Sequence, residues 1–526
     1  MDTATQEKAQ QTYRNLFWLL LFSVTLFRLA IAGRFGLGTD ESHYVLFSRH
    51  LAWGYFDHPP MVAFLAALTT LAGDEVFFVR LGPIICAATT LVILRFLALA
   101  LYRDERVAFW AAVLLLSMPY QHLQAVALLP DSTLNLFWCG ALLAAWVALR
   151  EGKWSAWVLL GLSTGGALLS KYHAVLLPLC LLGYVLSSPG RRVWLGRIQP
   201  YVAGLLALLI FLPNILWNAR HDWVSYAFQL AHGGSGHFSL SKLLAVLGGQ
   251  MGAWSPVIFG LLIAVFISMA RERPLSEPDR FVLWTSLPVF LFFCGMGTFG
   301  KILPHWPAVG WWTGSLAVTA VTLRKISKGD TPGTRWRRWC VSGLIIGFMM
   351  TGFLYLAIFK PVVGPLYSRA RDVSIMLNRH FPVIRPLEPF NSQNDITNAL
   401  FGWEDIGKRV EQIRAEMPAP EKTFIFCHRF YPTSQLAVYL HPETKATTLR
   451  NKINQYRFWF SAEDHRGWDA LFVVEDRAVE RSRRYRPLFQ EMDPEPVKIE
   501  VFRKDQIAHL MRVFRYYDFK GKYEEK

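Results

Sequence analysis

The sequence is short of charged residues and has no recognisable cysteine pattern. Only 18% of its 526 residues are Asp, Glu, Lys or Arg, whereas 53% are hydrophobic and 14% are aromatic. This balance is too apolar for an ordinary soluble protein of this length, so we expect a membrane protein. The six cysteines form no CxxC pair and suggest no disulfide framework. Internal repeats and low-complexity segments are also lacking.

A cleavable leader and a nucleotide-binding loop are not indicated either. The first residues, MDTATQEKAQQTYRN, lack the short apolar core and the small-residue cleavage site of a signal peptide. The apolar run that follows is long enough to span a bilayer, so we expect a retained first membrane helix. HGGSGH at 232–237 contains loop-forming glycines, but no strand precedes it and no Lys-Ser or Lys-Thr follows it.

Apolar runs of spanning length are frequent in the first two thirds of the chain and predict about eleven transmembrane helices. The fifth and sixth runs are short and are separated only by SKYHA, so they could form one re-entrant or tilted pair. The eleven runs cover approximately residues 15–33, 76–102, 107–128, 132–149, 155–171, 174–188, 201–217, 243–270, 281–297, 305–323 and 340–359.

Lys and Arg are concentrated in every second loop between these runs, and the alternate loops carry far fewer. Because basic loops stay in the cytoplasm, this pattern predicts a cytoplasmic N-terminus and a C-terminal part on the opposite side. The net charge of +16 then reflects membrane topology and not a nucleic-acid surface. Sixteen basic residues fall in five loops, at 103–106, 150–153, 187–197, 271–280 and 324–338.

The composition changes after Lys360, where charged residues become frequent and apolar runs shorten to strand length. We therefore expect a transmembrane domain at 1–359 and a small mixed α/β domain at 360–526, exported to the outer face, with an irregular connector at 360–400. Strands are predicted at 424–428, 469–476 and 497–502, and amphipathic helices at 403–417 and 433–440.

Acidic residues cluster in the first outer loop. Asp40 and Glu41 follow the first helix directly, and Asp57 and His58 follow the amphipathic stretch SHYVLFSRHLAWGY. Pro59–Pro60 then fixes the chain direction before MVAFLAALTTLAG, which is too short to span a bilayer. We expect both stretches to be interfacial helices at the membrane surface.

Further polar residues stand at the outer ends of later helices. Charged groups at membrane depth are costly and usually mark a functional cavity. Carboxylates could serve as a general base or hold a cation, and Lys or His could hold a phosphate, so a phosphate-bearing lipid substrate is expected. These residues are Asp131, Lys171, His173, Lys301 and His305.

Simpler interpretations exist for several of these groups. The Asp40–Glu41 pair and Asp131 could cap helices, and Lys171 could extend its ammonium group to the interface. His43 and His50 are seven residues apart and would share a helix face, but two histidines without a third ligand are a weak metal signal. Interfacial packing is the favoured interpretation of these two histidines.

Five segments in order resemble the GT-C membrane glycosyltransferases, and most closely their family 39. That family includes protein O-mannosyltransferases, the lipid A aminoarabinose transferase and the lipopolysaccharide galacturonic-acid transferases. The resemblance runs from about residue 15 to 320, and GWEDIGKRVEQIRAEM and NQYRFW near the C-terminus are similar to the bacterial lipopolysaccharide branch. The five segments are TDESHY, YFDHPPM, LPDSTLN, ALLSKYHAVLLP and KILPHWPA.

The resemblance implies a mainly α polytopic fold in a bacterial inner membrane. It also implies inverting transfer of a sugar from a polyprenyl-phosphate donor to lipid A, lipopolysaccharide or another envelope acceptor, without a nucleotide cofactor. Asp40 would be the general base, and Glu41 would support it. Asp57 and His58 match an acidic residue followed by lysine in the family, so His58 departs from the pattern.

The remaining site assignments rest on the resemblance and on charge. Asp131 matches an acidic residue near the family's active site, while Lys171, Lys301 and His305 are expected to contact the donor phosphate. A divalent cation near Asp40, Asp57 and His43 is left open, because family members differ in metal use. The alternatives are a transporter or flippase of lipid-linked sugars, a protein O-mannosyltransferase, and a binding-only relative.

Overall fold

The computed structural model describes residues 3–234, 236–272, 274–380 and 385–524, and the chain divides into two compact units. The transmembrane unit consists of Met1–Ala32 and Leu51–Gly352, and the C-terminal unit consists of Gly33–His50 and Phe353–Lys526. The first-loop segment that carries Asp40 and Glu41 therefore belongs to the C-terminal unit. The sequence gives no sign of this grouping.

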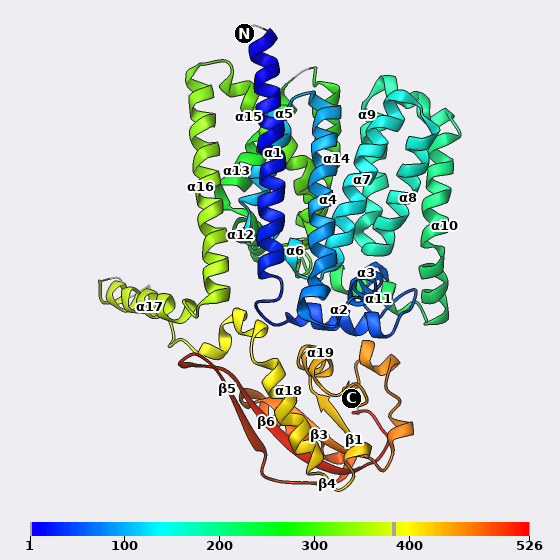
Figure 1. Ribbon diagram of the computed structural model, residues 1–526, viewed down its shortest axis with the longest axis vertical. Helices are drawn as coiled ribbons and strands as arrows, with labels where there is room; N and C mark the ends of the chain where they lie inside the picture. The colour runs from blue at the N-terminus through cyan, green and yellow to red at the C-terminus, as the bar shows by residue number, and fades with distance from the viewer. Residues whose placement is uncertain (1–2, 235, 273, 381–384, 525–526) are drawn as a thin grey trace. The chain divides into compact units, whose positions relative to one another are not determined.

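Long helices lying side by side form the transmembrane unit (Figure 1). The last helix, α16, begins in this unit and ends in the C-terminal unit. The helices are α1 (Thr3–Ile31), α3 (Met61–Thr70), α4 (Val76–Tyr102), α5 (Glu105–Leu116), α6 (Pro119–Val126), α7 (Pro130–Glu151), α8 (Trp154–Ser170), α9 (Leu176–Ser187), α10 (Gln199–Arg220), α11 (Val224–Gly234), α12 (Leu240–Trp254), α13 (Pro256–Arg271), α14 (Glu277–Gly297), α15 (Gly310–Ile326) and α16 (Thr331–Phe359).

All eleven expected runs are helical, but two of them are broken. The run at 107–128 divides before Pro119, and the run at 243–270 divides before Pro256, because proline cannot continue the hydrogen bonding of a preceding helix. By length and composition, six of the described helices could cross a membrane, or eight if each of two bent pairs is one span. The expected number of eleven stays a prediction.

Hydrogen bonds join the basic loops at one end of the transmembrane unit. Arg191 donates to Glu277 over 2.8 Å, and Arg324 donates to Asp279 over 3.1 Å. The hydroxyl of Tyr102, at the end of α4, also donates to Asp279 over 3.1 Å. These bonds place loops that are far apart in the sequence on one side, as their alternation predicts.

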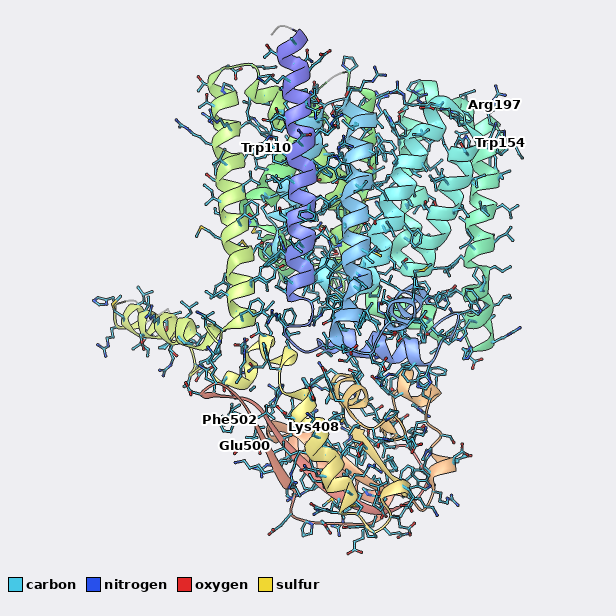
Figure 2. All side chains as sticks on the ribbon, viewed as in Figure 1. Trp110, Trp154, Arg197, Lys408, Glu500 and Phe502 are labelled. Atoms are coloured by element: carbon cyan, nitrogen blue, oxygen red, sulfur yellow. The ribbon has the colours of Figure 1, made fainter. Side chains whose placement is uncertain are left out.

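The N-terminal helix begins at this same end. The amide of Gln10 donates to Asp104 over 3.0 Å, and Asp104 caps α5 by accepting from the backbone N–H of Arg106. Trp154, which follows one basic loop, and Arg197, which ends another, both lie at this end of the helices in Figure 2. The start of α1 and the basic loops thus share one end of the helical unit.

Small residues allow close helix packing within the transmembrane unit. A Cβ atom on Gly161 of α8 would lie 2.7 Å from the carbonyl oxygen of Ala203 on α10, and one on Gly165 would lie 2.7 Å from the Cβ of Ile210. Such close backbone approach is typical of helix interfaces in membranes. Large aromatic residues, among them Trp138 and Trp311, fill the core elsewhere.

The C-terminal unit contains a mixed six-stranded sheet with strand order β2-β1-β3-β6-β4, in which β5 also pairs with β6 (Figure 1). Strands β2, β1 and β3 are parallel, whereas β6 is antiparallel to β3, β4 and β5. The strands are β1 (Thr423–Cys427), β2 (Ala446–Thr448), β3 (Asp469–Glu475), β4 (Phe489–Met492), β5 (Val497–Arg503) and β6 (Gln506–Phe519), and the helices are α2 (Thr39–Arg49), α17 (Val363–His380), α18 (Trp403–Ala415), α19 (Phe430–Tyr439) and α20 (Ser482–Tyr485).

Each face of the sheet is covered by its own hydrophobic core. On β1, Ile425 and Cys427 point to the core that includes α18 and α19, while Phe424 and Phe426 point to an aromatic core on the opposite face. This alternation is the period of two expected of a strand. The short helix α20 lies over the aromatic face, where its Tyr485 is fully buried.

The structure confirms the predicted strands and helices of this domain but adds several elements. Strands β2, β4 and β6 were not predicted, and β6 is the longest strand described. The interpretation of 360–400 as an irregular connector is wrong for Val363–His380, which forms α17. Pro365 lies in its first turn, where proline fits a helix, so the prolines of this segment do not exclude a helix.

Arg503 ties the end of α16 to the sheet of the C-terminal unit. Its guanidinium group donates to the carbonyl oxygen of Ala357 over 2.8 Å and to the hydroxyl of Thr397 over 2.6 Å, and it lies 4.0 Å from the ring centre of Phe401. The side chain is buried, so these acceptors replace water around its charge.

Candidate active site

The segment that carries Asp57 and His58 is held by helices of the transmembrane unit. The hydroxyl of Ser225 donates to the carbonyl oxygen of Tyr55 over 2.8 Å, and the amide of Gln229 donates to the carbonyl oxygen of Asp57 over 2.6 Å. The His58 ring nitrogen lies 3.3 Å from the Asp57 carboxylate. Helix α11 therefore fixes the backbone on which both predicted site residues stand.

Asp131 and Lys171 form a buried ion pair. The Lys171 ammonium group donates to both carboxylate oxygens of Asp131, over 3.0 and 2.8 Å. Asp131 lies in the first turn of α7, and Lys171 follows the last residue of α8 in an extended conformation that points its chain away from the helix. The N-cap residue of α7 is Leu129, so the helix-capping interpretation of Asp131 is wrong, and Lys171 is buried instead of extending to the interface.

His305 lies near this ion pair, outside the helices that flank it. Its ring stacks on Tyr120 with a centroid distance of 5.5 Å, and it lies near enough to Asp131 and Lys171 for an electrostatic interaction with them. An imidazole carries a ring N–H in either protonation state, so His305 can donate a hydrogen bond.

His173 and Lys301 differ in how they relate to this group. His173 is near enough to interact with the charges of Lys171 and Asp131, and its ring packs against Phe293 at 5.4 Å. Lys301 is exposed, and among the described residues it forms no ion pair or side-chain hydrogen bond. The structure thus brings Asp131, Lys171 and His305 together but gives Lys301 no contact with them.

Asp40 and Glu41 lie in the first turn of α2, which begins at Thr39, earlier than the amphipathic pattern predicts. Carboxylates are favourable there because they face the positive end of the helix dipole. Glu41 is buried, and its carboxylate accepts from the backbone N–H of Gly38 over 2.8 Å, so it caps the helix. Asp40 is exposed.

The two first-loop histidines take part in aromatic packing in the C-terminal unit. His43 Nδ1 lies 3.1 Å from the hydroxyl of Tyr456, and the His50 ring stacks on Trp459 at 4.5 Å. Within the described ranges, no group of three His, Cys, Asp or Glu side chains is placed to hold a metal ion. Of the residues considered for a cation, Asp40 and His43 belong to one unit and Asp57 to the other.

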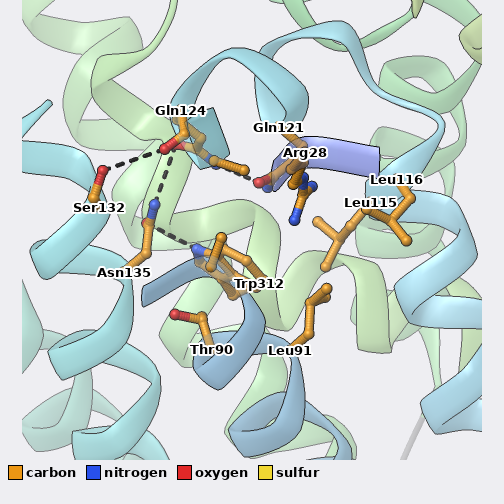
Figure 3. A pocket seen from close by; sticks show the side chains of 12 residues that line it. Arg28, Thr90, Leu91, Leu115, Leu116, Gln121, Gln124, Ser132, Asn135 and Trp312 are labelled. Carbon is orange, nitrogen blue, oxygen red and sulfur yellow. Dashed lines mark hydrogen bonds between the residues drawn. The ribbon is translucent and has the colours of Figure 1, made fainter. Parts of the chain in front are cut away.

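A small polar cavity in the transmembrane unit was not predicted (Figure 3). Its volume is about 20 Å³, and it is lined by side chains of Arg28, Gln124 and Asn135, among others. The Asn135 amide donates to Gln124 over 3.1 Å, and the indole N–H of Trp312 donates to Asn135 over 2.8 Å. The cavity could have been predicted from the polar residues within the apolar runs, because polar residues in a membrane helix usually face the protein interior.

Comparison with known proteins identifies the family. A family model described as dolichyl-phosphate-mannose-protein mannosyltransferase matches residues 57–217. An undecaprenyl phosphate-alpha-4-amino-4-deoxy-L-arabinose arabinosyl transferase of Pseudomonas paraeruginosa is 32% identical over 381 residues, which cover 66% of this chain and 67% of that protein. The chain belongs to the family 39 GT-C membrane glycosyltransferases. The resemblance inferred from the sequence is confirmed.

Other members of this family match over a smaller part of their length. A lipid A galacturonosyltransferase of Rhizobium johnstonii is 26% identical over 295 residues, which cover 55% of this chain and 61% of that protein. An aminoarabinose transferase of Serratia proteamaculans is 25% identical and is covered over 54% of its length. The chain thus spans about half to two thirds of the length of the curated relatives that it matches.

Solved structures confirm the GT-C fold. The apo structure of ArnT from Cupriavidus metallidurans aligns with a TM-score of 0.62 at 16% identity, covering 94% of this chain and 97% of that one. An oligosaccharyltransferase of Archaeoglobus fulgidus aligns with a TM-score of 0.51 at 11% identity, covering 87% of this chain and 70% of that one. A helical membrane protein with an additional sheet domain is therefore the architecture of this family member.

Proposed function

We propose that this protein is an inverting glycosyltransferase that moves a sugar from a polyprenyl-phosphate donor to lipid A or another lipopolysaccharide acceptor. The reaction would take place on the periplasmic side of a bacterial inner membrane. Family membership supports the reaction class, and the printed names of the relatives, which include lipid A galacturonosyltransferase and undecaprenyl-phosphate aminoarabinose transferases, support the donor and acceptor classes.

The observation that carries the proposal is the charged group formed by Asp131, Lys171 and His305. Asp131 is in the first turn of α7, a helix of 22 residues whose last turns lie beside the basic loops, where Arg191 donates to Leu149. At about 1.5 Å per residue, this group lies some 30 Å from those loops, on the far side of a bilayer core. A buried ion pair at the outer boundary of the bilayer core is expensive to maintain and favours a functional role.

In the proposed reaction, the acceptor hydroxyl attacks the anomeric carbon of the donor sugar. A bond forms between the acceptor oxygen and this carbon, while the bond from the carbon to the phosphate oxygen breaks, so the configuration inverts. The hydroxyl proton passes to the Asp40 carboxylate, which acts as the general base. The polyprenyl phosphate leaves with its electron pair, and cationic or hydrogen-bonding groups stabilise its negative charge.

The residues of the transmembrane unit would bind the departing phosphate. Lys171 offers the positive charge, and Asp131 fixes its position through two hydrogen bonds. His305 would donate a hydrogen bond from its ring. Lys301 is exposed and free of described ion pairs, so it is a candidate for contact with the phosphate on substrate entry. Asp57 and His58 would line the same outer surface.

Transfer of a labelled sugar tests this function directly. The purified protein is incubated with polyprenyl-phosphate sugars and with lipid A, core oligosaccharide and peptide acceptors, and products are resolved by mass spectrometry. We expect transfer to lipid A or the oligosaccharide, and a loss of about 10²-fold or more in Asp40→Asn, because that is the usual contribution of a general base. Asp372→Asn, an exposed carboxylate on α17, is the matched control.

Two outcomes would contradict the proposal in different ways. Transfer that is undiminished in Asp40→Asn would remove Asp40 from the role of base. An absence of transfer to every acceptor, together with movement of the lipid-linked sugar across a bilayer, would favour a flippase. Transfer to the peptide alone would indicate protein O-glycosylation.

A further inference from the structure

Arginine residues are concentrated at one edge of the sheet in the C-terminal unit. Cys427 at the end of β1 is in register with Thr448 at the end of β2 and with Val473 near the end of β3. Because the three strands are parallel, their carboxyl ends meet at the same edge. The segments that follow these ends carry Arg429, Arg450, Arg481, Arg483, Arg484 and Arg486.

The order of the strands makes this edge a topological switch point. From β1 the chain passes through α19 to β2 on one side, and it then crosses to β3 on the other side of β1. The chain after β1 enters α19, which packs in one core of the sheet, and the chain after β3 enters α20, which packs in the other core. In open α/β sheets, ligands bind outside the carboxyl ends of the strands at such a switch point.

Buried residues hold the arginine-bearing segment after β3 in place. Tyr485 is fully buried, and its hydroxyl lies 2.7 Å from Nδ1 of His428, the residue that follows β1. Ser482 is also buried, and its carbonyl oxygen accepts from the hydroxyl of Tyr516 over 2.6 Å. Arg483 alternates with these anchors and is exposed. The segment is thus fixed to the loop after β1 while its arginines face outward.

Four arginines lie near enough to His428 for their charges to act on its imidazole. Burial, followed by the charges of Arg481, Arg450, Arg484 and Arg429, lowers the pKa of this histidine to about 4. The arginines come from all three strand ends, so their positive potential adds up at one place. The imidazole is neutral near pH 7 and does not add to that charge.

Only one of the four arginines near His428 forms an ion pair among the described residues. Arg484 forms an ion pair with Glu524. In the part of the chain that the structure describes, no carboxylate forms an ion pair with Arg429, Arg450 or Arg481. Like charges gathered at one edge repel each other, and an anion bound between them would remove that cost.

The acidic residues that adjoin this edge have other partners. Glu475 accepts from Arg477 over 2.8 Å, and Asp476 accepts from Arg512 over 2.6 Å. The nearby Glu480 is exposed. Glu475 also interacts electrostatically with Arg429, but its described hydrogen bonds are with Arg477 and Tyr431.

Helix α2, which carries Asp40, packs against the helix that begins at this edge. Ser434 on α19 donates to the carbonyl oxygen of Thr39 over 3.4 Å, and the ring of His43 lies 5.5 Å from that of Phe430. Phe430 is the first residue of α19 and directly follows Arg429. Asp40 thus lies about one helical turn before His43, on a helix that packs against the start of α19 within the same unit.

We propose that Arg429, Arg450 and Arg481 form a binding site for a phosphate group of the glycolipid acceptor. The forked guanidinium group matches the oxygens of a phosphate and can donate two hydrogen bonds to it. Held at the switch point, the phosphate would place the acceptor sugar near Asp40. The assignment of the ligand as the acceptor rests on the proposed function, in which Asp40 deprotonates the acceptor hydroxyl.

The acceptor fits this site better than the donor does. The candidate donor-phosphate groups, Lys171, Lys301 and His305, all belong to the transmembrane unit. The arginines belong instead to the unit that contains the proposed base, and a base must meet the acceptor hydroxyl. Lipid A carries phosphate groups on its sugars, which is the chemistry that the arginines would bind.

Binding of lipid A to the full-length protein in detergent micelles tests this site. Microscale thermophoresis compares bis-phosphorylated lipid A with its dephosphorylated form, with phosphatidylglycerol and with inorganic phosphate. The test variant combines Arg429→Gln, Arg450→Gln and Arg481→Gln, and a second variant has Lys at the same three positions. Lys408→Gln, Arg409→Gln and Lys498→Gln together form the control, which removes the same charge from exposed positions elsewhere in the unit.

We expect the Gln variant to weaken the binding of phosphorylated lipid A at least tenfold, the Lys variant to restore part of it, and the control to match the wild type. Dephosphorylated lipid A should bind weakly to all of them. An unchanged Kd in the Gln variant would overturn the proposal, as would an equal loss for the dephosphorylated lipid. Equal affinity for phosphatidylglycerol would indicate a general membrane surface, and tight binding of phosphate alone would indicate a free anion.

Two further measurements separate this proposal from the proposed function. Undecaprenyl phosphate binding should be the same in the Gln variant and the wild type, and the temperature of unfolding should not fall. If the Gln variant does not fold, the Lys variant provides the test, because it keeps the positive charge but loses the forked guanidinium group. An affinity for phosphorylated lipid A equal to that of the wild type would then overturn the proposal. If the wild type binds lipid A through the arginines but transfers no sugar, the proposed function fails while the site stands.

Discussion

At the scale of single residues, the Asp131–Lys171 pair allows a test of what an unpaired buried charge costs in stability. Removing one partner of a buried ion pair leaves the other uncompensated and typically costs about 3–5 kcal/mol. We therefore expect Lys171→Met to lower the unfolding temperature markedly, and the double variant Asp131→Asn, Lys171→Met to recover much of that loss. Thermal unfolding in detergent measures both effects.

Among these Asp131 and Lys171 variants, sugar-transfer activity should not recover when stability does. If Lys171 binds the donor phosphate, the double variant remains inactive although it is stable. The exposed pair Glu404–Lys408 provides the control, because Lys408→Met should leave the unfolding temperature unchanged. A double variant that regains transfer would show that the pair has only a structural role.

His428 makes a pH-dependent contribution to the stability of the C-terminal unit. Its pKa in the folded state is about 4, below the ordinary value of 6.5, so between these two values the unfolded chain binds a proton that the folded chain does not. Stability is therefore lost as the pH falls from about 6.5 to 4. We expect this loss to be smaller in His428→Gln, measured as unfolding temperature against pH.

The comparison must separate His428 from the carboxylates that also titrate in this range. His441→Gln, at an exposed position in the same unit, should show the same dependence of unfolding temperature on pH as the wild type. Equal slopes for the wild type and His428→Gln would show that the histidine takes no part in the acid dependence.

Candidate site residues could be proposed from the sequence, but most of their contacts could not be predicted. Asp131, Lys171 and His305 were selected by their residue types at the outer helix ends and, for Asp131, by the family resemblance. Their meeting depends on how α7, α8 and the segment before α15 pack, which no local pattern encodes. The arginines of the switch point were missed for the same reason, since Arg429, Arg450 and Arg481 are dispersed along the sequence until β1, β2 and β3 align.

At the scale of elements, α17 has an apolar stripe on one side. Leu366, Val373 and Met376 are exposed, while Arg371 and Ser374 on another face form hydrogen bonds with Leu387. Helix α16 ends at Phe359 and α17 begins at Val363, so only three residues separate a membrane span from this stripe. An amphipathic helix in that position is expected to lie in the membrane interface.

A fluorophore on α17 can report its contact with lipid. In nanodiscs, we expect a polarity-sensitive label at Val373→Cys to emit at shorter wavelength than the same label at Ser368→Cys, which lies on the opposite side of the helix. The native cysteines are first replaced by Ser or Ala. Equal emission from both positions would place the whole helix in water.

Secondary-structure elements were predicted correctly where the sequence shows a single clear hydrophobic pattern. The strands FIFCH and DALFVVED are short apolar runs, and both were predicted. Strand β6 was missed because QIAHLMRVFRYYDF mixes charged residues with buried ones from both cores, so neither alternation nor a continuous apolar run stands out. Helix α17 was missed because the prolines near both of its ends suggested a loop.

At the scale of the whole molecule, the two units divide the proposed reaction between them. Residues 33–50 belong to the C-terminal unit, where Ser42 donates to Gln435 over 2.9 Å and the amide of Gln435 donates to the carbonyl oxygen of Leu37 over 3.0 Å. The proposed base therefore belongs to the unit that contains the sheet, and the proposed donor contacts belong to the helical unit. Such separation of acceptor and donor groups could not be predicted from a first loop that directly follows a membrane helix.

Orientation in the membrane is a further prediction at this scale, and it also tests the number of spans. The basic loops are joined to the start of α1 at one end of the helical unit, and α16 begins at a basic loop and leads into the C-terminal unit. If these loops are cytoplasmic, the N-terminus is cytoplasmic and the C-terminal domain is periplasmic. Opposite locations require an odd number of spans, such as eleven, whereas six or eight spans would place both ends on one side.

Reporter fusions in a bacterial host distinguish these cases. Alkaline phosphatase fused after the last residue should be active, and green fluorescent protein at the same position should be dark, because the first matures in the periplasm and the second in the cytoplasm. Fusions after Gly329, in a basic loop, should show the reverse pattern and act as the internal control. A fluorescent C-terminal fusion would place the sheet domain in the cytoplasm, and both Asp40 and the arginine site would then be on the wrong side of the membrane for a periplasmic acceptor.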